Sequence, residues 1–274
     1  GIDVSSIRIG ETESGIICAV RGAVVWNEKK CYKFLRIGPF PFHITEENKT
    51  RIFSELGQNP SSGLSLGIST PNETQRKLCN LVEKRVQTSI SGTASKSIIL
   101  WDGSLTAGVP GNPVNTVSQS LALARRNLNS VLAFSKSTTL RFLGWRITEI
   151  VSSHEPPCLL EIEDLPLSVS KTVHLLGKIY TVKLTPNGCS FRLDIDRSLR
   201  QEQAIVAVER LLGNEILFQG YPETLRLAHI YSTFTANDVL GIQSFLALEY
   251  GLKLIARHNI RRTLFGPYAT GIED

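Results

Sequence analysis

The chain has no methionine, no long uninterrupted apolar run and no closely spaced pair of cysteines among its five. A membrane-spanning helix needs about 20 mostly apolar residues, so we expect no membrane segment. No signal sequence opens the chain, which favours the cytoplasm. Isolated cysteines without a C-x-x-C pair argue against a disulfide framework or a zinc site. Because even an initiating methionine is missing, we expect the natural chain to begin before Gly1.

Several catalytic signatures are also absent. Without G-x-x-x-x-G-K-[ST] the chain should not hydrolyse ATP, and without G-x-S-x-G it lacks the usual serine hydrolase motif. Its 274 residues are 42% hydrophobic, enough for a full core, and its net charge of +5 suits a polyanionic partner. The paired arginines are candidate phosphate contacts: Arg125, Arg126, Arg261 and Arg262.

Hydrophobic periodicity predicts antiparallel strands first and alternating helices and strands afterwards. The expected early elements are strands at 2–9, 15–26 and 31–37, a helix capped by Asn72, a strand at 97–101, a helix opened by Asn112 and Pro113, and a strand at 131–134. More strands are expected within 140–196, and helices at 198–212, from Pro222 and at 237–250. We therefore predict one α/β domain over residues 1–274, with an RNase H-like mixed sheet (an antiparallel meander plus parallel strands) and helices on both faces.

Two aspartates occupy strand positions that favour a ligand role. Asp3 lies among apolar residues of the first strand, where an ionised carboxylate is costly unless it is paired. Asp102 follows the apolar run 98–101 and precedes Gly103, at the end of a strand where α/β sheets bind ligands. The alternatives are a turn aspartate for Asp3 and a simple Asp-Gly turn for Asp102.

A helical glutamate and a late histidine complete the candidate set. Glu83 borders the apolar stripe of its helix, so it points either to the end of the sheet or to solvent. Glu73 is the competing acid, but in a first helical turn it would complement the helix dipole. His229 follows Leu225 by four residues and is either a hydrogen-bonded core histidine or a ligand.

These elements converge at one end of an RNase H-like sheet. Hard divalent cations need several oxygen ligands close together, and distant sequence positions that converge can supply them. A pair of such ions would activate a water molecule and stabilise the leaving 3′ oxygen at phosphorus. The acids therefore predict a two-metal phosphodiester hydrolase.

Three short motifs resemble the NurA family of DNA-end-processing nucleases. They are G-Y-P-x-x-L-x-x-A-H at 220–229, Asp102-Gly103-Ser104-Leu105, and Ser135-Lys136-Ser137. The resemblance implies four metal ligands, Asp3, Glu83, Asp102 and His229, with Lys136 as a cation near the scissile phosphate. The chain departs from the family in having Asp3-Val4-Ser5 where Asp-Gly-Ser is usual.

The same resemblance implies a 5′–3′ exonuclease and single-strand endonuclease that uses Mn²⁺, with Mg²⁺ as the alternative metal. It implies DNA ends and single-stranded DNA as substrates, a homodimer, and work beside a HerA-type hexameric translocase in double-strand-break resection. The Piwi domain of Argonaute proteins is similar in fold and in its Gly-Ile-Asp-Val start, so a guide-directed nuclease is the second reading. A catalytically inactive RNase H-like scaffold that binds DNA is the third.

Overall fold

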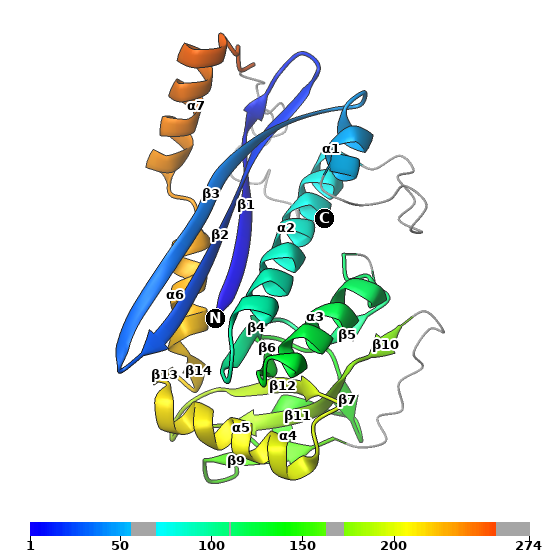
Figure 1. The fold of residues 1–274 in the computed structure, drawn as a ribbon, viewed down its shortest axis with the longest axis vertical. Coiled ribbons are helices and arrows are strands. Elements are labelled where there is room, and N and C mark those ends of the chain that lie inside the picture. The colour runs from blue at the N-terminus through cyan, green and yellow to red at the C-terminus, as the bar shows by residue number, and fades with distance from the viewer. Residues whose placement is uncertain (56–69, 110, 163–172, 256–274) are drawn as a thin grey trace.

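A computed structural model of the chain describes residues 1–55, 70–109, 111–162 and 173–255 (Figure 1). Its main sheet has eight strands in the order β3-β2-β1-β4-β6-β12-β11-β9. Their bounds are β1 (Ile2–Glu11), β2 (Gly15–Glu28), β3 (Cys31–Thr45), β4 (Ile98–Asp102), β6 (Ser130–Ser135), β9 (Cys158–Glu161), β11 (Gly177–Lys183) and β12 (Ser190–Asp196). β4 is parallel to β1 and β6, and the other neighbours are antiparallel, so the predicted meander followed by parallel strands is confirmed.

The described helices are α1 (Lys49–Glu55), α2 (Pro71–Thr93), α3 (Val114–Arg126), α4 (Ile147–Ile150), α5 (Gln201–Asn214), α6 (Glu223–Ser232) and α7 (Ala236–Tyr250). Three short strand pairs join β5 (Thr106–Ala107) to β10 (His174–Leu175), β7 (Arg141–Phe142) to β8 (Trp145–Arg146), and β13 (Leu217–Phe218) to β14 (Tyr221–Pro222). Among the helices that the structure describes, none has the length and apolarity needed to cross a membrane.

The residues of β4 alternate between two hydrophobic cores. Ile99 and Trp101 join a core with Leu81 of α2 and Leu121 of α3, whereas Leu100 joins the core beneath α5 and α6. Because successive strand residues point to opposite faces, helices must cover both sides of the sheet, as predicted. A third, smaller core lies between α7 and the strands β1 and β2.

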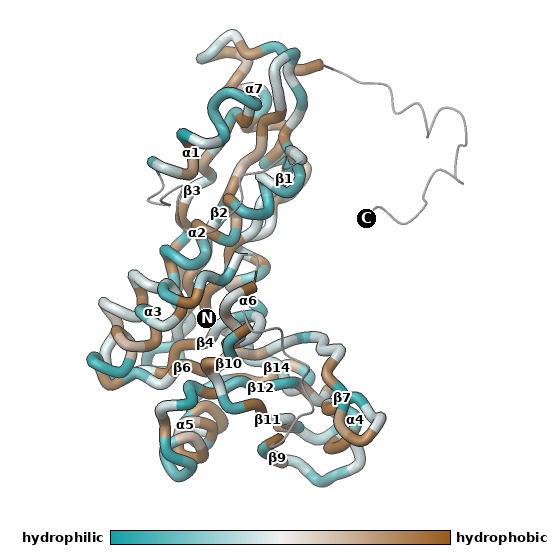
Figure 2. Tube along the Cα trace, turned by 90° about the vertical axis from the view of Figure 1, so that its right-hand side faces the viewer, coloured by the Kyte–Doolittle hydropathy of each residue, from teal (hydrophilic) through white to brown (hydrophobic). Residues whose placement is uncertain are grey.

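The first three strands extend well past the rest of the sheet. β1 pairs with β2 from Ile2 to Glu11 but with β4 only through Ile2 and Trp101. Figures 1 and 2 accordingly show β1, β2 and β3 running away from β4, β6, β11 and β12, with α2 and α6 near the point of departure. The carboxyl end of β4 therefore opens beside the start of β1.

Two predicted boundaries are wrong for identifiable reasons. The N-cap of α2 is Thr70, not Asn72: the Thr70 hydroxyl accepts a hydrogen bond from the backbone of Glu73, and Pro71 occupies the first turn. The third strand was predicted to end at Ile37 but continues to Thr45. β3 is an edge strand, where prolines such as Pro39 can be tolerated because the outer backbone groups need no partner.

Candidate active site

Asp3 and Asp102 lie next to each other where β1 and β4 meet. Ile2 and Trp101 are paired across the parallel strands, and both are buried in the core beneath α2 and α3. The next residue on each strand therefore turns to the opposite face, the one that α6 covers. The structure thus brings the two predicted aspartates together from positions 99 residues apart, since 102 − 3 = 99.

Glu83 lies in the middle of α2, and its carboxyl interacts electrostatically with both aspartates. Burial raises the pKa of the Glu83 carboxyl, Lys84 counteracts this, and the negative charges of Asp3 and Asp102 raise it further. Such mutual repulsion acts only over short distances in a site that is partly shielded from water. The predicted helical glutamate therefore lies within electrostatic range of both strand aspartates.

Glu73, the competing glutamate, caps the N-terminus of α2. Its Oε2 accepts a hydrogen bond of 3.1 Å from the backbone of Thr70, and its own backbone N–H donates to the Thr70 hydroxyl at 3.3 Å. This is a capping box, which satisfies the exposed amides at the start of a helix. Ten residues of helix, about 15 Å, separate Glu73 from Glu83.

His229 stands at the rim of this cluster. Its Nδ1 lies 3.4 Å from Asp3 Oδ2, and its side chain is 54% exposed. The alternative of a buried core histidine is therefore wrong. The Ser232 hydroxyl, one helical turn further along α6, donates to the same oxygen of Asp3.

Lys136 pairs directly with Asp102. Its Nζ lies 2.6 Å from Asp102 Oδ2, and half of its side chain remains exposed. The turn after Asp102 is held against β6, because the Gly103 N–H donates to Phe134 O at 2.7 Å and the Ser135 hydroxyl donates to Gly103 O at 2.7 Å. Gly103 has a φ of +111°, a conformation that side chains rarely adopt, so the sharp turn requires glycine.

Tyr221 is a neighbour of the site that the sequence reasoning did not select. Burial raises the pKa of its hydroxyl well above the ordinary value, and the charges of Asp102 and Asp3 raise it further. The group is therefore a neutral donor, yet its geometry falls short of a hydrogen bond to any described residue. Lys136 Nζ lies 5.6 Å from the centre of its ring. The motif at 220–229 includes this tyrosine, but the resemblance to NurA implies a role only for His229.

The donor set fits a divalent cation in its chemistry. Three carboxylates and one imidazole are ligands that manganese and magnesium accept. Within the described residues, no three His, Cys, Asp or Glu side chains surround a common point. Lys136 pairs with Asp102 instead, and Ser232 and His229 contact Asp3. A bound cation would relieve the repulsion that Asp3 and Asp102 exert on Glu83.

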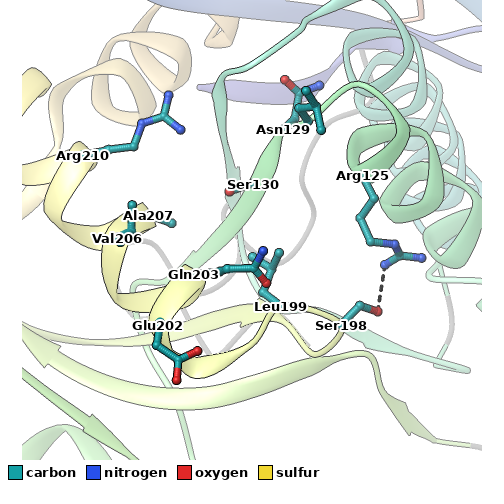
Figure 3. A pocket seen from close by; sticks show the side chains of 11 residues that line it. Arg125, Asn129, Ser130, Ser198, Leu199, Glu202, Gln203, Val206, Ala207 and Arg210 are labelled. Carbon is teal, nitrogen blue, oxygen red and sulfur yellow. Dashed lines mark hydrogen bonds between the residues drawn. The ribbon is translucent and has the colours of Figure 1, made fainter.

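Arg125, one of the four arginine candidates, lies away from the acidic cluster. Arg125 donates to the Asp196 carboxylate at 2.7 Å and to the Ser198 hydroxyl at 3.1 Å, so it is engaged within the fold. It borders a cavity of about 500 Å³ between α3 and α5 that also reaches Ser130, the first residue of β6 (Figure 3). Asp102 lies beside the opposite end of β6, so this cavity is separate from the acidic cluster. Arg261 and Arg262 lie outside the described residues.

The fold and the cluster define an α/β protein with a mixed sheet and acids at the carboxyl end of β4. Among solved structures, it is similar to the NurA nuclease from Sulfolobus solfataricus, with a TM-score of 0.56 and 18% identity over 91% of this chain and 83% of that chain. No family model and no curated protein matches the sequence. At this identity the likeness concerns the fold, and it agrees with the fold that the NurA motifs implied.

Proposed function

We propose that the chain is a metal-dependent deoxyribonuclease. The observation that carries the proposal is the meeting of Asp3 and Asp102 on adjacent parallel strands, with the half-buried Glu83 carboxyl within electrostatic range of both. The likeness to the fold of a NurA nuclease supports the same class of reaction. Asp3, Glu83, Asp102 and His229 are the proposed metal ligands.

We assign a separate role in phosphodiester hydrolysis to each side chain of the site. A divalent metal, when bound, would polarise a water molecule and neutralise charge at phosphorus. Asp3, Glu83 and Asp102 would hold it through anionic oxygens, and His229 would add a ring nitrogen from the solvent side. Lys136 exchanges its contact with Asp102 for one with the scissile phosphate. The neutral Tyr221 hydroxyl donates a hydrogen bond into the site.

The finer assignments follow the NurA motifs. We propose 5′–3′ exonuclease and single-strand endonuclease activity with Mn²⁺, with Mg²⁺ as the alternative metal. The proposed substrates are DNA ends and single strands. The proposed partners are a second copy of the chain and a HerA-type translocase in double-strand-break resection.

The first prediction is that Asp102→Asn and Asp3→Asn each abolish degradation of end-labelled DNA in the presence of Mn²⁺. Losing a ligand should lower the rate by more than the roughly 10–100-fold typical of losing an outer partner of a metal site. Each variant keeps the volume of the side chain, and circular dichroism checks that it is folded. Undiminished cleavage by a folded variant would contradict the proposed site.

A matched pair on α2 sharpens this test. Glu83→Gln should be inactive, whereas Glu73→Gln should cleave normally and lose only part of a helix cap, about 0.5–1 kcal/mol of stability. Cleavage that persists in EDTA would contradict metal dependence. If the wild-type protein binds DNA but does not cleave it, the chain is a scaffold. Cleavage that requires a guide strand would favour the Piwi-like alternative.

A further inference from the structure

Two polar side chains are buried behind Glu83. Lys84 is 8% exposed and Gln87 is 1% exposed, both on α2. Burying an ammonium and an amide is costly unless each is hydrogen bonded. The Lys84 ammonium lies 5.6 Å from the centre of the Trp101 ring, on the core side of the strand that ends at Asp102.

Hydrogen bonds join these groups to Glu83 in a single chain. Lys84 Nζ donates to Gln87 Oε1 at 2.9 Å, and Gln87 Nε2 donates to Glu83 Oε1 at 2.9 Å. An ammonium can only donate, so the amide must turn its oxygen toward Lys84 and its NH₂ toward Glu83. Glu83 and Gln87 are four residues apart on one helix face, where side chains meet without strain.

The geometry points to Gln87, fixed by Lys84, as a positioning residue for Glu83. The inference rests on the proposed function, because it concerns how Glu83 is presented to the metal. Gln87 donates a hydrogen bond to one carboxylate oxygen of Glu83 from the core side. This bond restricts rotation of the Glu83 side chain. The carboxylate is thereby held in one orientation before any ligand arrives. Such outer partners strengthen metal binding by roughly 10–100-fold.

The test measures Mn²⁺ affinity without DNA, from the electron paramagnetic resonance signal of free Mn²⁺. The proteins are the wild type, Gln87→Leu, Glu83→Gln and the combination of the two. Gln87→Leu should weaken binding by about 10–100-fold. The combined variant should bind no more weakly than Glu83→Gln alone, because Gln87 acts only through Glu83.

Two further variants keep the result interpretable. Gln87→Leu leaves the Lys84 ammonium without its partner, which destabilises the core. Lys84→Met with Gln87→Leu removes both polar groups and should show the same loss of affinity in a stable fold. Thr88→Val is the matched control, because it breaks the 2.7 Å contact with Ser120 of α3 and leaves the Glu83 chain intact. Its Mn²⁺ affinity should equal that of the wild type.

Each outcome has one meaning. A wild type that binds no Mn²⁺ would overturn the proposed function itself. If the wild type binds, Glu83→Gln binds weakly and a folded Gln87→Leu binds normally, only the positioning role is overturned. Equal losses in Thr88→Val and Gln87→Leu would attribute the effect to the stability of α2 and would also overturn it.

Discussion

Lys136 is held by two neighbours, the Asp102 carboxylate at 2.6 Å and the face of the Tyr221 ring at 5.6 Å. We predict that Lys136→Met lowers the single-turnover cleavage rate by about 10²-fold, because a positioned cation stabilises charge that grows in the transition state. DNA affinity should fall much less. Rate and affinity are measured on the same variant, and equal proportional losses would make Lys136 a binding residue only.

The sequence indicated the residues of this site unequally. Asp102 was recognisable because an apolar run leads to it and a glycine follows, and the structure puts Asp3 beside it. His229 could be read two ways, because periodicity does not say which face of a short helix is buried. Lys84 and Gln87 carried no signal, since a polar residue on an ordinary helix is recognised as buried only when its tertiary neighbours are known.

At the scale of the elements, an ion pair between Arg21 and Asp238 connects β2 to α7. Arg21 of β2 is 4% exposed; it donates to Asp238 Oδ1 at 2.8 Å and to Thr233 O at 3.2 Å. We predict that Asp238→Asn destabilises the fold by roughly 1–3 kcal/mol, because the buried guanidinium loses its charged partner. Urea unfolding measures the loss, and hydrogen exchange should be faster throughout α7. Unchanged exchange in that helix would contradict this role for the pair.

The same contact predicts a pH dependence. The hydrogen bond from Arg21, followed by those from Thr235, holds the pKa of Asp238 well below its usual range. A group whose pKa is lower in the folded chain stabilises the fold above its unfolded value, about pH 4 for aspartate, and loses that effect as the pH falls. The stability difference between wild type and Asp238→Asn should therefore shrink from pH 7 to pH 3. A constant difference would exclude the linkage.

The longer a helix or strand is, the more reliably its position could be predicted from the sequence. Long strands and helices repeat their apolar pattern often enough to be recognised, as β2 and α2 were. The start of α2 was misplaced because Thr70-Pro71-Asn72 offers two suitable caps, and only the observed hydrogen bonds select Thr70. Two-residue strands such as β5 and β14 have no period at all, and they exist only because a partner strand lies beside them.

At the scale of the whole molecule, the excess of basic residues is modest, with a net charge of +5. We predict that affinity for single-stranded DNA falls as salt rises, with a log–log slope set by the phosphates neutralised. Lys136→Met should reduce that slope by about one. Lys49→Met is the control, because this first residue of α1 pairs with Glu46 at 2.6 Å, and α1 lies far along the strands from β4 (Figure 1). Fluorescence anisotropy measures both, and equal changes would contradict contact at Lys136.

The hydrogen bond between Ser232 and Asp3 joins residues 229 positions apart. During synthesis, the first carboxylate therefore leaves the ribosome long before the helix that covers it has been translated. Contacts of such high sequence separation form late in folding. A growing chain that ends before α6 has neither His229 nor Ser232, the two α6 side chains that contact Asp3. The proposed site is therefore complete only after α6 has been translated and has packed beside β1.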